Sequence, residues 1–482
     1  MAYRSGDRYQ MGLFPQSIEE YVTPDAPVRA YDAFVEALDF DALGIEIDPH
    51  KVGNAAYHPK AMLKLLVYGY SYGVRSSRKL EQETHNNLTF IWLMGGLKPD
   101  FKTIAEFRRT HKEALTNVLR QCARLCMKLN LIAGNVLFVD GTRIRANAGR
   151  DALHGKDWYE EELAAVDGRI ARLLEQCEAQ DRQEEGLGSF VAMDKELGTA
   201  RRRKEKIEAA LREIAATDRR IVNRTDPDCA LMRSPQGSHA GYNVQMVVDD
   251  AHRLIVHAEP VSDSGDVNQF ARQIIRADEV LETPCEFACA DAGYADTEEL
   301  EKIDGQGITV IVPSQRQALH GKEDPFGKHR FTYDPVEDWY LCPEGKRLTY
   351  RSTYRRNGKR TYKIARASWC RVCVHFGRCT RSKEGRKVVR LKSEGLKEHL
   401  ERQYQDPVSQ AIYARRKAAV EHPFGHIKRN LRVTAFLLRG LAGVRAETAL
   451  VATCFNMVRM MTILGVKQLI RVLMTRPLTV PG

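Results

Sequence analysis

Two short apolar runs, each closed by an aspartate, constrain this chain more than any other feature of its sequence. Residues 136–139 (VLFV) lead into Asp140, and residues 287–290 (FACA) lead into Asp291. Apolar runs of this length are typical of buried strands. A carboxylate at the tip of such a strand must be exposed, paired or bound to a cation. Because strand tips at one edge of a sheet converge, the sequence predicts that the two carboxylates share one site.

Further strand and helix patterns surround these two runs. Residues 241–249 and 254–258 are β-rich and are separated by a short turn, which predicts a hairpin. Helical periodicity covers about residues 268–281 and 297–303, and residues 308–313 form another apolar run. The order strand, hairpin, helix, strand, helix, strand predicts a mixed α/β fold in which helices flank the sheet.

The length of the chain implies several structural units. With 482 residues it exceeds what one small core needs. The predicted divisions are an N-terminal helical, DNA-binding domain at residues 1–130, the first part of the core at residues 131–157 and 221–313, a helical-hairpin insertion at residues 158–220, a basic four-cysteine insertion at residues 314–405, and C-terminal helices that complete the core at residues 406–482.

The N-terminal unit shows little strand character. Apolar residues at helical spacing begin near Pro59 and again near Ser76, and a third helix is predicted from Thr103 with a capping box to Glu106. Short helices with exposed basic side chains fit a helix-turn-helix motif that binds DNA. A helical packing domain with a solvated basic face fits the same pattern equally well.

The two insertions differ in their periodicity. Residues 158–220 repeat a three-four apolar spacing on both sides of the turn-rich residues 184–189, which predicts an antiparallel helical hairpin. Most of its Lys and Arg side chains are expected to form a solvated face. Residues 314–405 show no such regularity, and we expect irregular structure there.

The charge of the chain favours a polyanionic partner. The net charge is +11 and the estimated pI is 9.0. Residues 351–390 alone hold fourteen Lys or Arg against one acid, Glu384. Residues 1–15 show no secretory signal, and basic side chains interrupt the apolar residues 448–474, which favours a buried helix pair over a membrane span. We therefore expect a cytoplasmic, nucleoid-associated bacterial protein without a membrane partner.

Four of the eleven cysteines lie within the basic insertion. They are Cys342, Cys370, Cys373 and Cys379. A CxxC pair between two further cysteines supplies the ligand count of tetrahedral zinc in a chain for which no disulfide framework is expected. Packed or free thiols are the alternative, because a second CxxC pair is missing.

A third acid, Glu421, lies on a predicted helix, with Lys428 two turns later on the same face. A lone carboxylate in this position is usually a solvated surface residue. Three carboxylates cannot all be ionised at close range unless a cation offsets their repulsion. Mg²⁺ or Mn²⁺ suits such oxygen ligands, and two ions in one active site support both phosphodiester hydrolysis and strand transfer.

Three segments together resemble a known family. Residues 138–142 (FVDGT), 290–294 (ADAGY) and 420–429 (VEHPFGHIKR) look, in this order, like the three acidic blocks of the DDE transposases of bacterial insertion sequences. The helical region before Asp140 is similar to the N-terminal domain of such transposases, and the four-cysteine block resembles an insertion that some of them carry.

The resemblance implies a ribonuclease H-like core. It places Asp140 on the first strand, Asp291 after the fourth strand and Glu421 on a helix beyond the fifth, as catalytic residues that bind Mg²⁺ or Mn²⁺. A related transposase group has Tyr and Arg at fixed spacings before its Glu and Lys seven residues after it. Lys428 fits that spacing, whereas Tyr413 and Arg416 each stand one residue too far upstream.

The implied activity is DNA transposition. The chain is expected to bind terminal inverted repeats as double-stranded DNA, cleave the phosphodiester bonds and join the 3′ ends to target DNA, as a homodimer or higher assembly on DNA. Lys428, Arg143, Arg145 and Arg429 are the candidate DNA contacts. Two alternatives stay open: a ribonuclease H-fold nuclease without strand transfer, and a catalytically inactive zinc-containing DNA-binding regulator.

Other acids lie in turn-rich segments. They are Asp226, Asp228, Asp263 and Asp266. Acids in such segments more often shape turns than bind metal, so none of them is predicted to belong to the site.

Overall fold

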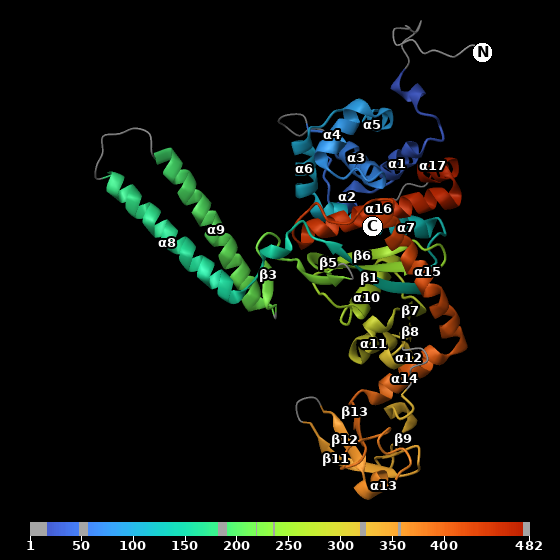
Figure 1. Ribbon diagram of the computed structural model, residues 1–482. Helices are drawn as coiled ribbons and strands as arrows, with labels where there is room; N and C mark the ends of the chain where they lie inside the picture. Colours follow the sequence, from blue (N-terminus) through green and yellow to red (C-terminus); the bar gives the residue numbers. More distant parts are fainter. Residues whose placement is uncertain are drawn as a thin grey trace, which may run out of the picture.

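The computed structural model describes residues 17–47, 56–181, 190–217, 219–234, 237–318, 324–354 and 358–475. Figure 1 shows N-terminal helices above a central sheet, a long helical hairpin that projects to one side, and a small β-rich unit below. The central sheet lies between the N-terminal helices and the β-rich unit.

The N-terminal unit is helical, as predicted. Its elements are η1 (Ile18–Tyr21), α1 (Pro27–Glu36), α2 (Phe40–Leu43), α3 (Pro59–Ser71), α4 (Ser77–Asn86), α5 (Leu88–Leu93), α6 (Phe101–Thr110) and α7 (Lys112–Lys128). The prediction that Thr103 caps the third helix was wrong, because α6 begins two residues earlier. The Asp100 side chain caps it by accepting a hydrogen bond from the Thr103 backbone N–H at 2.8 Å.

The central sheet contains six strands. They are β1 (Val136–Arg145), β4 (Ala230–Ser234), β5 (Gly237–Asp249), β6 (Ile255–Val261), β7 (Phe287–Cys289) and β8 (Thr309–Ile311). Their order is β4-β5-β1-β7-β8, with β6 also paired to β5; β1, β7 and β8 are parallel, whereas β5 runs antiparallel to β1 and β6. The sequence placed Asp140 at a strand tip, but β1 continues five residues beyond it because β5 pairs along its whole length.

Helices cover both faces of this sheet. Alternate residues of β1 point to opposite faces, so Leu137 and Val139 join the large core with α7, α10 (Phe270–Leu281) and α16 (Leu441–Leu464). Phe138 instead packs against α14 (Glu394–Gln405) and α15 (Pro407–Arg429). Because α15 covers this second face, it lies beside the side of β1 on which Asp140 stands.

The C-terminal helices belong to the body of the molecule. α16 is buried along most of its length and is followed by α17 (Val466–Thr475). Within the described ranges, no single helix is long and apolar enough to cross a membrane. α16 and α17 meet the length and composition only as a pair, and that pair is bent by 108°.

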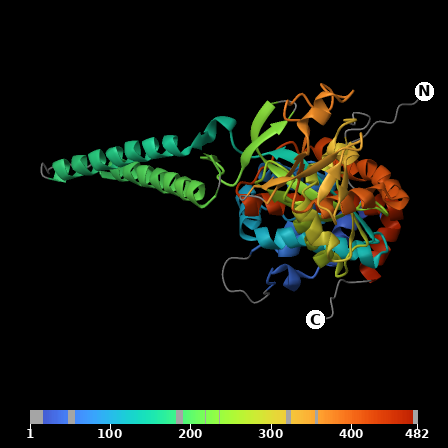
Figure 2. The ribbon, with the colours of Figure 1, turned by 90° about the horizontal axis from the view of Figure 1, so that it is seen from below.

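The predicted helical hairpin is formed by α8 (Lys156–Asp181) and α9 (Phe190–Ala216). It rises from a small sheet of β2 (Leu153–Gly155) and β3 (Ile221–Asn223), and Figure 2 shows it extending away from the rest of the molecule. Buried Tyr159, Val166 and Ile207 form part of its own small core. The predicted turn at residues 184–189 lies outside the described residues.

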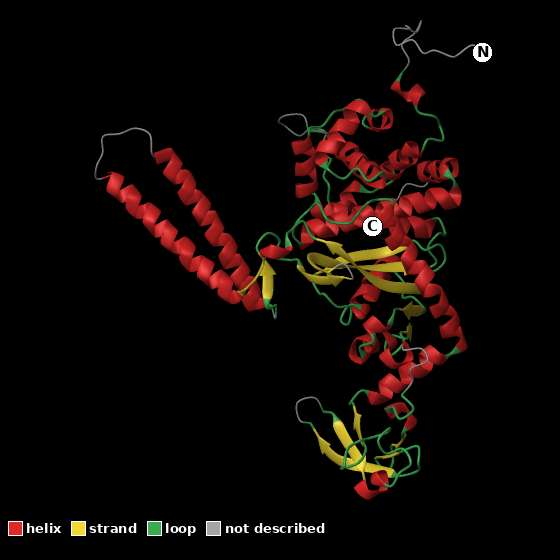
Figure 3. Ribbon diagram, viewed as in Figure 1, coloured by secondary structure: helices red, strands yellow, loops and turns green. Residues whose placement is uncertain are grey.

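The expectation of irregular structure in the basic insertion was wrong. β9 (Thr332–Asp334), β10 (Trp339–Leu341), β11 (Arg347–Thr353), β12 (Arg360–Ile364) and β13 (Lys387–Arg390) form an antiparallel sheet, followed by α14 on the central sheet (Figure 3). One face buries Tyr340, Leu348 and Tyr362. The strands are short and carry basic side chains on their exposed positions, so their alternation was hidden in the sequence.

The remaining short elements connect these units. They are η2 (Arg150–Ala152), η3 (Ala292–Tyr294), α11 (Thr297–Asp304), α12 (Gln315–Ala318), η4 (Lys328–Arg330) and α13 (Ala367–Arg371).

Candidate active site

The register of β1 against β7 places the two predicted aspartates side by side. The parallel pairing ends with Phe138 opposite Cys289. Each acid follows two residues after this last pair: Asp140 is still on β1, and Asp291 lies just past the end of β7. Paired strands run about 4.8 Å apart, so the two acids lie near each other. The structure therefore brings together two acids that are far apart in the sequence, as the pattern predicted.

Asp140 lies in a largely buried position. Its side chain is 22% exposed, and its Oδ2 atom lies 3.2 Å from the Arg416 guanidinium on α15. Burial raises the pKa of Asp140 from 3.8 to about 6; Arg416 opposes this rise, while the nearby carboxylates of Asp291 and Asp266 add to it. A further positive charge beside Asp140 would therefore stabilise the ionised carboxylate.

Asp291 begins the turn η3. Its Oδ1 atom accepts a hydrogen bond from the Gly293 backbone N–H at 2.7 Å, so the side chain caps this turn. The contact fixes the carboxylate at the end of β7, next to the segment that carries Asp140.

Asp266 belongs to the same cluster, although the sequence assigned it to a turn. Its Oδ1 atom accepts hydrogen bonds from Asn243 at 2.7 Å and from Gln245 at 2.8 Å, both on β5. The position follows β6, and the only sequence signal was a turn-rich segment, SDSGD, that contains two acids. Such segments are common in loops, so the cluster became visible only in the folded chain.

Glu421 lies on α15 but does not pair with the aspartates. Its side chain is 65% exposed, and the nearest cation is Lys417 at 3.8 Å. Lys428, on the same face two turns later, donates a hydrogen bond to Thr142 on β1, while Arg416 reaches Asp140. Glu421 therefore lies between two positions of α15 that both contact β1, on the helix face that Lys428 shares.

Tyr413 and Arg416, which stood one residue out of the expected spacing, also lie at this site. Tyr413 packs edge-on against Tyr404 with ring centroids 5.1 Å apart, and the Arg416 guanidinium lies 5.7 Å from the Tyr413 ring centroid. The Arg416 guanidinium therefore contacts both the Tyr413 ring and the Asp140 carboxylate.

The other predicted DNA contacts are exposed. Arg143 and Arg145 lie on β1 beyond Asp140, and Arg429 ends α15. Arg143 also donates a hydrogen bond to the Ser264 carbonyl at 3.1 Å, in the loop that carries Asp266. Arg143, Arg145 and Arg429 thus lie on β1 and α15, the elements that carry Asp140 and Glu421.

The four cysteines of the basic insertion face one small pocket. All four, together with Trp369 and His375, line a cavity of about 260 Å³. The Lys346 backbone N–H donates to Cys342 Sγ at 3.3 Å, and burial together with the three neighbouring thiols raises the pKa of Cys379. The fold therefore brings together four thiols from a segment of 38 residues, from Cys342 to Cys379.

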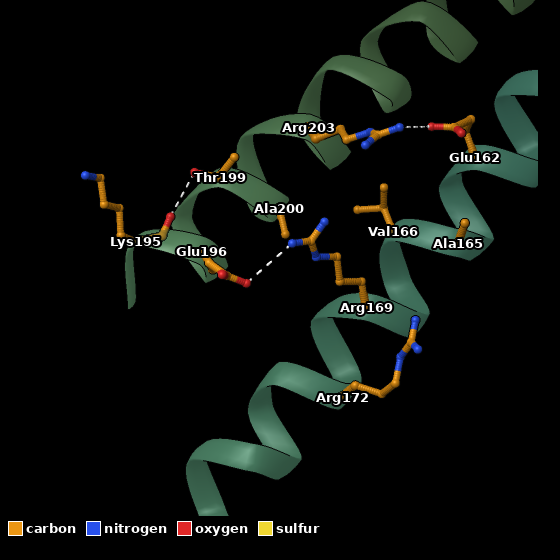
Figure 4. A pocket seen from close by; sticks show the side chains of 10 residues that line it. All are labelled: Glu162, Ala165, Val166, Arg169, Arg172, Lys195, Glu196, Thr199, Ala200 and Arg203. Atoms are coloured by element: carbon orange, nitrogen blue, oxygen red, sulfur yellow. Dashed lines mark hydrogen bonds and ion pairs between the residues drawn. The ribbon is translucent and has the colours of Figure 1, made fainter. Parts of the chain in front are cut away.

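Neither the acids around Asp140 nor the four cysteines are arranged as a metal site in the structure. Over the described ranges, no three His, Cys, Asp or Glu side chains are arranged so that they could hold a metal ion. A separate hollow of about 630 Å³ lies between α8 and α9 and is lined by side chains such as Val166 and Ala200. Figure 4 shows ion pairs across it, from Arg203 to Glu162 and from Arg169 to Glu196. The hollow is therefore part of the helical hairpin, and none of the candidate acids lines it.

Two family models match the chain. One, described as a transposase domain (DUF772), matches residues 16–110. The other, described as a transposase DDE domain, matches residues 341–461, which include Glu421 and Lys428. No curated protein matches the chain.

The matched residues thus lie in the helical N-terminal unit and in a segment that runs from β10 of the basic insertion into α16. These matches support the assignment of the chain to the transposases. Together they support a DDE transposase of the insertion-sequence family, which implies a DNA substrate and the use of a divalent metal ion.

Proposed function

We propose that this chain binds the terminal inverted repeats of its element, cleaves the DNA and joins the 3′ ends to target DNA. The observation that carries the proposal is the proximity of Asp140 and Asp291: each follows two residues after the last pair of the parallel strands β1 and β7, and the Asp291 carboxylate helps to raise the pKa of Asp140. The strand order β6-β5-β1-β7-β8, with helices on both faces, supports a ribonuclease H-like core.

Asp140, Asp291 and Glu421 are the proposed ligands of two Mg²⁺ or Mn²⁺ ions. The donor set fits such ions, because carboxylate oxygens are hard ligands and Asp140 is held in a buried, electronegative position. When bound, the ions would activate water or a 3′-hydroxyl and stabilise the leaving oxygen. Glu421 is included because it stands on α15 between Arg416 and Lys428, which both contact β1.

The surrounding residues have separate roles in this proposal. Arg416 offsets the charge of Asp140 while the site holds no cation. Lys428, Arg143, Arg145 and Arg429 would contact DNA phosphates beside the acids. Two copies of the chain would bring the two element ends together.

The cysteine pocket is the proposed site of a structural zinc ion. Four thiols around one small cavity, with a backbone N–H directed at a sulfur atom, support this assignment. Metal analysis of protein purified without chelator is expected to find one zinc per chain. Absence of zinc would leave the thiols as packing residues.

Cleavage of a DNA fragment that carries one element end tests the main proposal. Asp140→Ala, Asp291→Ala and Glu421→Ala are each expected to abolish Mg²⁺-dependent cleavage and to leave end binding nearly unchanged. Asp250→Ala is the matched control, because Asp250 pairs with Arg415 of α15 and lies beside Val136 at the start of β1, four residues before Asp140. Full cleavage by any of the three variants would remove that residue from the site.

Strand transfer from a pre-cut end separates the proposal from simple hydrolysis. A transposase is expected to join the 3′ end to a target duplex. Cleavage without joining would identify a nuclease.

A further inference from the structure

A buried glutamine connects the segments that carry the candidate acids. Gln245 on β5 is fully buried and stands directly opposite Gly141 in the pairing of β1 with β5. Its Nε2 atom donates to Asp266 Oδ1 at 2.8 Å. Its Oε1 atom accepts from the Tyr294 hydroxyl at 2.5 Å. One side chain thus contacts both the loop after β6 and the turn after β7.

The Gln245 side chain also packs against the backbone next to Asp140. A Cβ atom added at Gly141 would lie 2.5 Å from Gln245 Nε2 and 2.8 Å from Asp266 Oδ1. A residue with a side chain therefore cannot replace Gly141 unless these polar groups move. The close approach fixes the distance between the Gln245 carboxamide and the β1 segment that carries Asp140.

Tyr294 completes the connection on the other side. It ends the turn that Asp291 begins and is itself buried. Because its hydroxyl donates to Gln245, the position of this turn depends on the same carboxamide that holds Asp266. Asn243, also buried, donates a second hydrogen bond to Asp266.

The two contacts of Gln245 require a side chain that donates one hydrogen bond, to Asp266, and accepts another, from Tyr294. A carboxylate at position 245 would place a second negative charge against Asp266. An apolar side chain would leave the buried Tyr294 hydroxyl without its acceptor, which is costly, and would remove one of the hydrogen bonds to the half-buried Asp266. Glutamine satisfies both partners.

We propose that Gln245 is a positioning residue of the active site, which holds the segments bearing Asp140, Asp266 and Asp291 at a fixed separation for metal binding. This inference rests on the proposed function of Asp140 and Asp291. Gln245 acts through these segments and does not itself contact DNA or metal.

Gln245→Met tests the inference, since methionine keeps the length of the side chain and removes both hydrogen bonds. Residues that orient metal ligands typically change metal affinity or activity by about 10- to 100-fold when they are replaced. We expect the cleavage rate at fixed Mg²⁺ to fall by about that factor, while end binding stays within about threefold of the unmodified chain. Mn²⁺ binding to the DNA-free protein, followed by electron paramagnetic resonance, is expected to weaken by about tenfold.

Gln273→Met is the matched control. Gln273 is equally buried but lies on α10, where its Nε2 atom faces Glu259 at 3.5 Å. Both variants are expected to lose thermal stability to a similar degree, whereas only Gln245→Met should weaken Mn²⁺ binding. Tyr294→Phe should also weaken Mn²⁺ binding, but to a smaller extent than Gln245→Met. The double variant should bind Mn²⁺ little more weakly than Gln245→Met, because both substitutions remove the same hydrogen bond between Tyr294 and Gln245.

The outcomes separate the two proposals. If Gln245→Met binds Mn²⁺ and cleaves as Gln273→Met does, or if the Tyr294→Phe loss adds fully to it, the positioning role is overturned and the proposed function stands. If the unmodified chain neither cleaves element ends nor binds Mn²⁺, the proposed function fails first, and the inference fails with it.

Discussion

Replacing Asp140 with asparagine should stabilise the protein even though it abolishes cleavage. Burial raises the pKa of this carboxyl group from 3.8 to about 6. Between these values the folded state binds more protons than the unfolded state, so stability falls as the pH rises from about 4 to about 6. Above pH 6 the ionised carboxylate destabilises the fold by about 3 kcal/mol, at 1.36 kcal/mol per pKa unit.

Asparagine removes this charge and keeps the shape of the side chain. The gain in the free energy of unfolding should therefore depend on pH: about 3 kcal/mol at pH 8, about 1.5 kcal/mol at pH 5 and about 0.5 kcal/mol at pH 4, where the carboxyl is becoming protonated in both states. Urea unfolding of the DNA-free protein in the presence of a chelator, followed by circular dichroism, measures this difference.

Asp250→Asn is the control for this measurement. Its side chain is exposed to a similar extent, 24% against 22%, and it too pairs with an arginine of α15, at 2.7 Å. Loss of that surface ion pair should change stability by about 0 to 1 kcal/mol in the destabilising direction. The reasoning is refuted if Asp140→Asn is no more stable than the unmodified chain at pH 8, or if its advantage is the same at pH 4.

Three further substitutions test contacts in and outside the candidate site. Arg416→Gln removes the cation that lowers the pKa of the acid on β1, so that pKa should rise and the acid limb of the cleavage pH profile should move to higher pH, whereas Arg415→Gln should leave it in place. Gly141→Ala should reduce cleavage by about 100-fold, while Gly149→Ala, where a Cβ meets nothing within 4 Å, should cleave normally; equal activity would contradict the packing. Glu447→Ala should destabilise the fold by about 3 to 5 kcal/mol in urea unfolding, because the fully buried Glu447 carboxylate pairs with Arg75 at 2.7 Å and accepts hydrogen bonds from the backbone N–H groups of Leu437 and Leu438; a loss below 1 kcal/mol would contradict this reasoning.

Much of the secondary structure was readable from local pattern. The apolar runs before Asp140 and Asp291 are strands, residues 241–258 form a hairpin, and the three-four spacing in residues 158–220 marks two long helices. These patterns are reliable because periods of two or 3.6 residues arise from near neighbours in the chain. The basic insertion was missed because its strands are three to seven residues long and carry charges on their exposed positions.

The candidate site was only partly predictable. The pattern placed Asp140 and Asp291 at the tips of two strands of one sheet. Asp291 does follow the end of β7, whereas β1 continues past Asp140. It assigned Asp266 to a turn, and the roles of Asp140, Asp291 and Glu421 as metal ligands are part of the proposal. Glu421 lies on the expected helix, but the position of its side chain depends on how α15 packs against β1.

By itself, the sequence determined which segments become strands and helices and which acids end the apolar runs, because these features depend on residues close together in the chain. Only the tertiary structure decided the partners of those acids. Arg416 and Asp140 are 276 residues apart, and Gln245 and Tyr294 are 49 apart. Contacts of this kind are set by strand register and helix packing, which depend on the whole fold at once and leave no local pattern in the sequence.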